Sequence, residues 1–135
     1  MTMFNLWKDR EKGLMDPLLF SETAEKFAKE IAAEGEKNRN NKGTQLRRFF
    51  DEIVRLQSQA KCLSKDDTDK WSNILPYIHM LVSKAAYAEG RRLVSPSFVN
   101  FLKTGIDQIK TPRDLTVFAN FFESFMGFYK LHGPN

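Results

Sequence analysis

Cationic side chains are concentrated in one short part of the chain, and their types suit contact with phosphate groups. Residues 37–61 carry seven basic and two acidic side chains, a net charge of +5, whereas residues 1–36 carry a net charge of −3. Arginine can hold a phosphate through two parallel hydrogen bonds, and lysine attracts it as a point charge. A localised basic block indicates an anionic partner more strongly than the net charge of +4 for the whole chain does.

The basic block joins a polar loop to an amphipathic helix. The loop, residues 35–43, is rich in glycine, asparagine and lysine, and Thr44 after it is a candidate N-cap. At about 100° per residue the apolar side chains that follow share one broad face. These are Leu46, Phe49, Phe50, Ile53, Val54, Leu56 and Ala60. The arginines fall on the other side of the helix and are predicted to face solvent or a ligand.

Ion pairing within the helix is the structural alternative for two of these arginines. Arg47 lies four residues before Asp51, and Arg48 stands in the same relation to Glu52. Exposed pairs at this spacing contribute only about 0.2–0.5 kcal/mol, so they would yield readily to a phosphate. Such pairs also leave the neighbouring cations of the loop unexplained.

The rest of the chain shows helical periodicity and no strand alternation. Further helices are predicted at residues 22–34 (ending at Gly35), from the acidic segment 64–69 to Gly90, at 98–109, and from Thr111 onward. Pro76 should kink the second of these or split it after Leu75. Ser95-Pro96 and Thr111-Pro112 each place a capping hydroxyl before a proline. The predicted fold is all-α, a compact bundle of about five helices.

One domain is expected from a length of 135 residues. Residues 1–20 lack periodicity and are predicted to be an N-terminal arm that packs on the domain or on a neighbour. Residues 21–135 are predicted to form the single helical domain, with a core rich in phenylalanine. The last helix carries a second apolar stripe, Val117, Phe121 and Phe128, which implies either deep burial or a surface for another subunit.

No arrangement of residues supports catalysis, a metal or a cofactor. His79 has no second ligand at metal-binding spacing, and the acidic cluster at 64–69 lacks the pattern of a calcium loop. Nucleophile and phosphate-loop motifs are absent, and the single cysteine, Cys62, cannot form an internal disulfide. No apolar run approaches the ~18 residues of a membrane span, and the N-terminus does not read as a secretory signal. We therefore predict a non-catalytic, cytoplasmic protein.

Several segments, taken in order, resemble the small subunit of the type III-A CRISPR (Csm) effector complex. They are Gly43–Phe49, Leu75–Ile78, Lys84–Arg91, the Phe98–Ile109 helix and the final phenylalanine-rich helix with Phe118, Phe121 and Phe122. The similarity covers roughly residues 21–133. The resemblance implies an all-α, non-catalytic protein present in more than one copy beside the subunits that hold the guide RNA. It also implies contact with the paired target RNA, mostly through its backbone, in antiviral defence.

Candidate RNA contacts follow from the positions that match this resemblance. Lys42, Gln45, Arg47 and Arg48 match the motif at the start of the second helix, and Lys84, Arg91 and Arg92 match or adjoin the second basic segment. Arg55 is added from helix geometry, and Lys37 and Arg39 lie in a variable loop nearby.

Phosphate contact is the favoured mode of binding, because guide pairing already supplies sequence selection. Base stacking is the weaker proposal, since most aromatic residues are at helix-core spacing. The alternative function is a structural helical adaptor whose basic block meets an acidic protein partner without contact to RNA.

Overall fold

The computed structural model describes residues 3–134, and within them the chain forms five α-helices and one turn of π-helix. The π-helical turn, Leu19–Thr23, leads directly into the first helix. The helices are α1 (Ala24–Asn38), α2 (Gly43–Lys61), α3 (Thr68–Gly90), α4 (Pro96–Ile106) and α5 (Pro112–His132). The described residues contain no strand, only an isolated β-bridge between Asp9 and Leu14. The all-α fold predicted from the sequence is confirmed.

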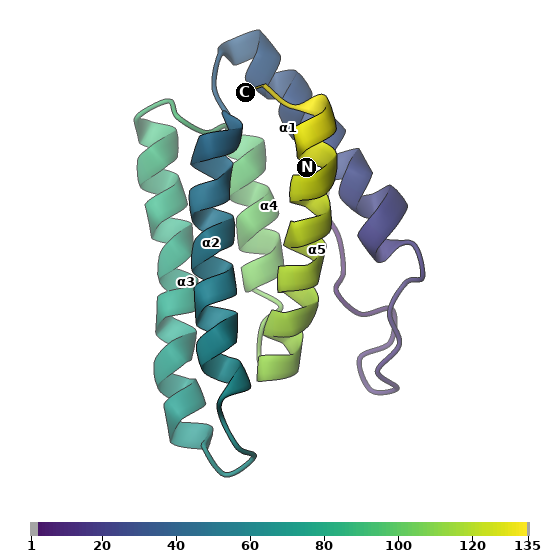
Figure 1. The fold of residues 1–135 in the computed structure, drawn as a ribbon, viewed down its shortest axis with the longest axis vertical. Helices are drawn as coiled ribbons and strands as arrows, with labels where there is room; N and C mark the ends of the chain where they lie inside the picture. The colour runs from purple at the N-terminus through teal and green to yellow at the C-terminus, as the bar shows by residue number, and fades with distance from the viewer. Residues whose placement is uncertain (1–2, 135) are drawn as a thin grey trace.

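Helices α2 to α5 run side by side in alternating directions, and α1 lies at an angle beside α5 (Figure 1). Helix α5 packs against both α1 and α2, while α3 packs against α2 and α4. This order brings the end of α1, the start of α2, the end of α3 and the end of α5 to the same end of the bundle. The candidate RNA contacts near these termini are therefore gathered by the topology.

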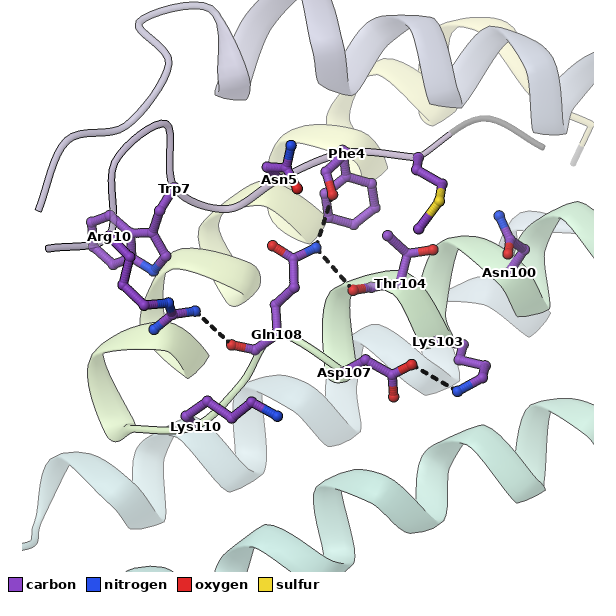
Figure 2. A pocket seen from close by; sticks show the side chains of 11 residues that line it. Phe4, Asn5, Trp7, Arg10, Asn100, Lys103, Thr104, Asp107, Gln108 and Lys110 are labelled. Atoms are coloured by element: carbon purple, nitrogen blue, oxygen red, sulfur yellow. Dashed lines mark hydrogen bonds and ion pairs between the residues drawn. The ribbon is translucent and has the colours of Figure 1, made fainter.

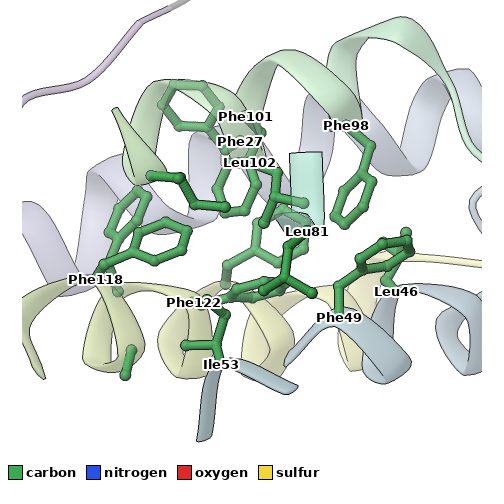
Figure 3. Close-up of a cluster of buried hydrophobic side chains, with 14 of the residues drawn as sticks. Phe27, Leu46, Phe49, Ile53, Leu81, Phe98, Phe101, Leu102, Phe118 and Phe122 are labelled. Carbon is green, nitrogen blue, oxygen red and sulfur yellow. The ribbon is translucent and has the colours of Figure 1, made fainter. Parts of the chain in front are cut away.

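Phenylalanine rings fill the space between the helices (Figure 3). Phe101 of α4 is fully buried, and its ring centroid lies 4.5–6.3 Å from those of four rings of α5, Phe118, Phe121, Phe122 and Phe125. Aromatic pairs at these separations contribute beyond the area that they bury. The prediction of a phenylalanine-rich core is confirmed.

The N-terminal segment, residues 3–18, lies against α1, α4 and α5. Phe4 is 5% exposed, and its ring centroid lies 4.4 Å from that of Phe121. Leu6 N donates to Gln108 Oε1 at 2.7 Å, and Gln108 Nε2 donates to the Phe4 carbonyl at 2.8 Å. Phe121 belongs to the second apolar stripe of α5, so this contact places it in the core and not on a surface for another subunit.

The start signals of α4 and α5 are confirmed. Ser95 Oγ accepts a hydrogen bond from Phe98 N at 3.3 Å. Thr111 Oγ1 accepts from Asp114 N at 3.3 Å, and the Asp114 carboxylate accepts from Thr111 N at 3.0 Å, which completes a capping box. A proline follows each cap at the first helical position. These caps define where α4 and α5 begin.

The prediction that the first helix ends at Gly35 is wrong. Helix α1 continues to Asn38, and Arg39, with φ of 57°, ends it in the left-handed conformation. A side chain at position 35 would collide with the returning loop, because a Cβ there would lie 2.7 Å from the Asn40 carbonyl oxygen. Gly35 therefore allows a close approach of the backbone and does not terminate the helix.

Pro76 does not split the third helix, because α3 is continuous from Thr68 to Gly90. Proline has no backbone N–H, so the carbonyl of Ser72, four residues earlier, lacks its usual helical donor. Ser72 and Pro76 are both exposed, so water can donate to that carbonyl instead. Two boundaries also shift: α2 begins at Gly43, before the expected cap, and α4 ends at Ile106.

Gly105 lies where α4 meets α5, and a side chain has no room there. A Cβ at position 105 would lie 2.1 Å from Phe118 Cε1. Gly105→Ala is expected to lower the free energy of unfolding by up to about 2 kcal/mol, because overpacking costs about 1–3 kcal/mol and the gain in helix propensity offsets ~1 kcal/mol of that cost. Urea denaturation measures the change. Gly127→Ala is the matched control, since nothing lies within 4 Å of a Cβ at that helical position. Equal effects of the two substitutions would contradict the prediction.

Candidate nucleic-acid interface

Two loops that are far apart in the sequence meet at one end of the bundle (Figure 1). The α1–α2 loop and the α3–α4 loop are joined by a hydrogen bond from Asn41 N to the Leu93 carbonyl at 3.0 Å. This contact gathers five exposed cations that we call the basic end: Lys37, Arg39, Lys42, Arg91 and Arg92. Within residues 3–134 none of the five forms an ion pair. The structure thus brings together predicted contacts from both basic segments.

Asn41 holds the two loops together, although the sequence identified it only as a loop residue. Its side chain is fully buried, and its φ of 54° is left-handed, a conformation that asparagine tolerates well. Nδ2 donates to the Ile31 carbonyl at 3.2 Å and to Ser95 Oγ at 2.8 Å, while Oδ1 accepts from Ser95 N at 2.7 Å. The signal in the sequence was an asparagine between polar loop residues, which indicates a turn but not its distant partners.

Helix α5 completes the same junction. The Tyr129 hydroxyl donates to the Asn41 carbonyl, and Gly43 N donates to the Pro134 carbonyl at 3.3 Å. Burial, with a smaller contribution from the charge of Glu36, raises the pKa of Tyr129 above its ordinary value. A tyrosine hydroxyl is protonated at neutral pH even without this shift, so it remains a donor to the loop.

Arg47 and Arg48 lie on different sides of α2, because neighbouring helical residues are about 100° apart. Arg47 lines a groove between the start of α2 and the end of α5, together with Phe50 and Lys130. Its predicted partner Asp51 is 3.8 Å away, and both side chains are exposed. This ion pair is present but long, so it holds Arg47 weakly.

A second row of predicted contacts follows the boundary between α2 and α3. Gln45, Arg48, Glu52 and Arg55 are spaced by three and four residues and share one side of α2. The pKa of Glu52 is lowered chiefly by hydrogen bonds from Arg55, against the effect of burial, and further by the charges of Arg55 and Lys84. Because Lys84 belongs to α3, this interaction places the row beside α3.

The ion pair between Arg48 and Glu52, the structural alternative to a phosphate contact, does not form, because Glu52 pairs with Arg55 instead. Arg55 Nε and Nη2 donate to the two carboxylate oxygens of Glu52 at 3.1 and 3.0 Å. A glutamate that precedes its basic partner suits the helix dipole better than the reverse order does. Arg48 has no ion-pair partner in the described part of the chain. The exposed pair is worth roughly 0–1 kcal/mol, so Arg55 could exchange Glu52 for a phosphate at small cost.

Several polar groups of a pocket near the end of α4 are hydrogen-bonded within the chain itself (Figure 2). Arg10 donates to the Gln108 carbonyl at 2.9 Å, and Gln108 Nε2 donates to the carbonyls of Phe4 and Thr104. Residues 3–134 contain no group of three or more His, Cys, Asp or Glu side chains that could hold a metal ion. The pocket ties the N-terminal segment to α4, and the exposed cations remain the candidate functional groups.

A family model described as Csm2 Type III-A matches residues 19–135. The matched range begins at the π-helical turn and includes all five helices and all ten candidate contacts. No curated protein and no solved structure matches the chain. None of the described helices has the length and apolar character needed to cross a membrane. Because the family model covers all but the first 18 residues, the resemblance is confirmed: the chain belongs to the Csm2 Type III-A family, as a structural small subunit that associates with other subunits of the type III-A Csm complex.

Proposed function

We propose that this small subunit binds the duplex of guide and target RNA through backbone phosphates, and that it takes part in antiviral defence in this way. The observation that carries the proposal is the junction of the two loops through Asn41, because it places cations from both basic segments at one end of the bundle. These cations have no carboxylate partner in residues 3–134. A surface of this kind attracts a polyanion.

The proposed contact is independent of base sequence. Arginine and lysine side chains on helix ends and loops suit phosphate oxygens, and sequence selection belongs to the pairing of guide and target. The subunit is proposed to be non-catalytic, without a metal or cofactor, and to act in the cytoplasm in more than one copy for each complex.

Charge reversal of the two adjacent arginines tests the proposal. Arg47→Glu and Arg48→Glu are each expected to weaken binding of a guide–target RNA duplex about tenfold or more, because a hydrogen bond to a charged group contributes about 1.5–3 kcal/mol. The slope of log affinity against log salt should fall by roughly 0.7–0.9 for each lost phosphate contact. The loss should not depend on target sequence. Both the purified full chain and the assembled Csm complex should be measured.

Lys65→Glu is the matched control, because Lys65 is exposed and lies in the α2–α3 connection at the far end of the bundle. It is expected to bind RNA nearly as the wild type does. Since Arg47 and Arg48 lie on different sides of α2, the single variants show which side contacts RNA. Normal assembly and RNA retention by the variant with both charge reversals would exclude Arg47 and Arg48 as contacts. The same result for Lys42→Glu and Arg92→Glu, at the basic end, would refute the proposal. Salt-independent binding of an acidic protein, with no appreciable RNA affinity, would favour the adaptor function instead.

A further inference from the structure

Two of the three tyrosines lie on the surface of α3, outside the core. Tyr77 is 57% exposed and Tyr87 is 68% exposed, whereas Tyr129 is 2% exposed. Met80, between the first two, is 42% exposed. Most large aromatic side chains of this protein are buried, so these two rings are exceptions that folding does not explain.

The two tyrosines share one face of α3 with polar and cationic side chains. We call it the tyrosine face: Asn73, Tyr77, Met80, Lys84 and Tyr87 of α3 together with Arg91, which directly follows the helix; the six are spaced by alternating steps of four and three residues. All six are exposed. Tyr77 and Tyr87 are separated by about 15 Å along the helix axis, at 1.5 Å per residue. The rings therefore mark an extended strip with a cation between them and another beside the second ring.

The charge of the tyrosine face fits an anionic partner. None of its residues is acidic, and Lys84 and the neighbouring Arg48 of α2 have no ion-pair partner in the described part of the chain. Glu52 of α2 is already paired with Arg55 of the same helix, whose hydrogen bonds lower the pKa of Glu52 more than the charge of Lys84 does. The Arg91 guanidinium lies 5.9 Å from the ring centroid of Tyr87, so a cation is held beside an exposed π-face.

We propose that the tyrosine face binds unpaired nucleotides of RNA, with bases stacked on Tyr77 and Tyr87 and phosphates contacted by Arg48, Lys84 and Arg91. The inference rests on the proposed RNA-binding function and extends it from duplex to single-stranded RNA. A base in a duplex is already stacked on its neighbours, whereas an unpaired base of any kind gains by stacking on an exposed ring. An acidic protein segment would use the cations but would gain little from the π-faces.

Binding of the purified full chain to a single-stranded RNA that carries 2-aminopurine tests this proposal, with the corresponding RNA duplex as a second probe. Tyr77→Leu and Tyr87→Leu remove the ring but keep apolar bulk and every charge. Each is expected to weaken single-strand binding about 5- to 10-fold, which is in the lower part of the range for a base stacked on an aromatic side chain. Each should also reduce the quenching of 2-aminopurine. The salt dependence should stay unchanged because no cation is removed.

Three controls separate stacking from other effects. Tyr77→Phe and Tyr87→Phe keep the ring and are expected to bind within about twofold of the wild type. Leu14→Ala removes a 49% exposed apolar side chain from the N-terminal segment and should leave binding unchanged. Circular dichroism of each variant checks that these surface substitutions preserve the helices.

Unchanged affinity and quenching in both leucine variants would overturn the proposal, as would equal losses on the duplex. If the leucine variants lost affinity for a poly-glutamate peptide to a comparable degree, the face would be assigned to an acidic protein partner, and the proposal would again be overturned. These measurements distinguish failure of this proposal from failure of the proposed duplex binding. If Arg47→Glu and Arg48→Glu weaken duplex binding while the leucine variants bind normally, only the tyrosine face is excluded. If the wild type binds neither RNA, both proposals are wrong.

Discussion

Replacing Asp114 with alanine is expected to lower the free energy of unfolding by about 3–5 kcal/mol, because hydrogen bonds to a charged group contribute about 1.5–3 kcal/mol each. The carboxylate is 1% exposed and accepts four hydrogen bonds. Oδ1 accepts from Trp7 Nε1 at 2.8 Å and Arg10 Nη1 at 2.7 Å, and Oδ2 accepts from Lys110 N at 2.8 Å and Thr111 N at 3.0 Å. The loss is smaller than the sum of the bonds because the half-exposed Arg10 can turn to water.

Urea denaturation of Asp114→Ala and of a matched control measures this effect. Asp107→Ala removes an aspartate that pairs with Lys103 at 2.7 Å on the surface, where both side chains are at least half exposed. That substitution is expected to cost less than about 1 kcal/mol, as exposed ion pairs generally do. If Asp114→Ala were no more destabilising than Asp107→Ala, the buried carboxylate would not be the anchor of the N-terminal segment.

The pKa of Asp114 determines how this stabilisation depends on pH. Burial raises the pKa, but hydrogen bonds from Lys110 N, Trp7, Thr111 N and Arg10 together outweigh it, so the pKa lies below its ordinary value. The folded state then binds fewer protons than the unfolded state, and the group stabilises the fold above the unfolded aspartate pKa of about 3.9. The contribution disappears as the pH falls through the folded-state pKa. Acid should therefore destabilise the wild type more than Asp114→Ala.

Asn41→Ala is expected to lower the free energy of unfolding by about 2–4 kcal/mol, because it leaves one buried donor without a partner, at about 1–3 kcal/mol, and removes two further hydrogen bonds. Ser95 N loses its acceptor, the Ile31 carbonyl loses the Asn41 amide as a donor, and Ser95 Oγ keeps only the hydrogen bond from Phe98 N. Alanine also tolerates the left-handed φ of 54° poorly. Equilibrium unfolding in urea measures the loss, and binding of the guide–target duplex shows whether the loop cations depend on this junction.

Two variants isolate the causes of this effect. Asn41→Gly accepts the left-handed backbone but removes the same hydrogen bonds, so it should be about 1 kcal/mol more stable than Asn41→Ala. Asn40→Ala changes the preceding asparagine, whose Oδ1 is buried without a partner in the described structure, and is expected to be nearly neutral. If Asn40→Ala destabilised the protein as much as Asn41→Ala does, the loss would reflect any substitution in this loop and not the hydrogen bonds of Asn41.

Local sequence alone was enough to determine the helices and several of their starts. Apolar residues at three- and four-residue spacing define a helix face whatever it packs against, and the hydroxyl–proline signals at Ser95 and Thr111 act within one turn. The concentration of charge in residues 37–61 is likewise a property of the chain. The ordered segments that resemble the Csm small subunit were also local, and the family match confirms the membership that they indicated.

Only the tertiary structure decided which of these parts work together. Asn41 meets Ser95 across 54 residues and Leu6 meets Gln108 across 102, separations at which local periodicity carries no information. The same packing placed Gly35 inside a helix and Phe121 in the core. It also left Tyr77 and Tyr87 exposed beside cations. Sequence determines a helix through contacts within a few turns, whereas a surface is assembled from segments that meet only after the chain has folded.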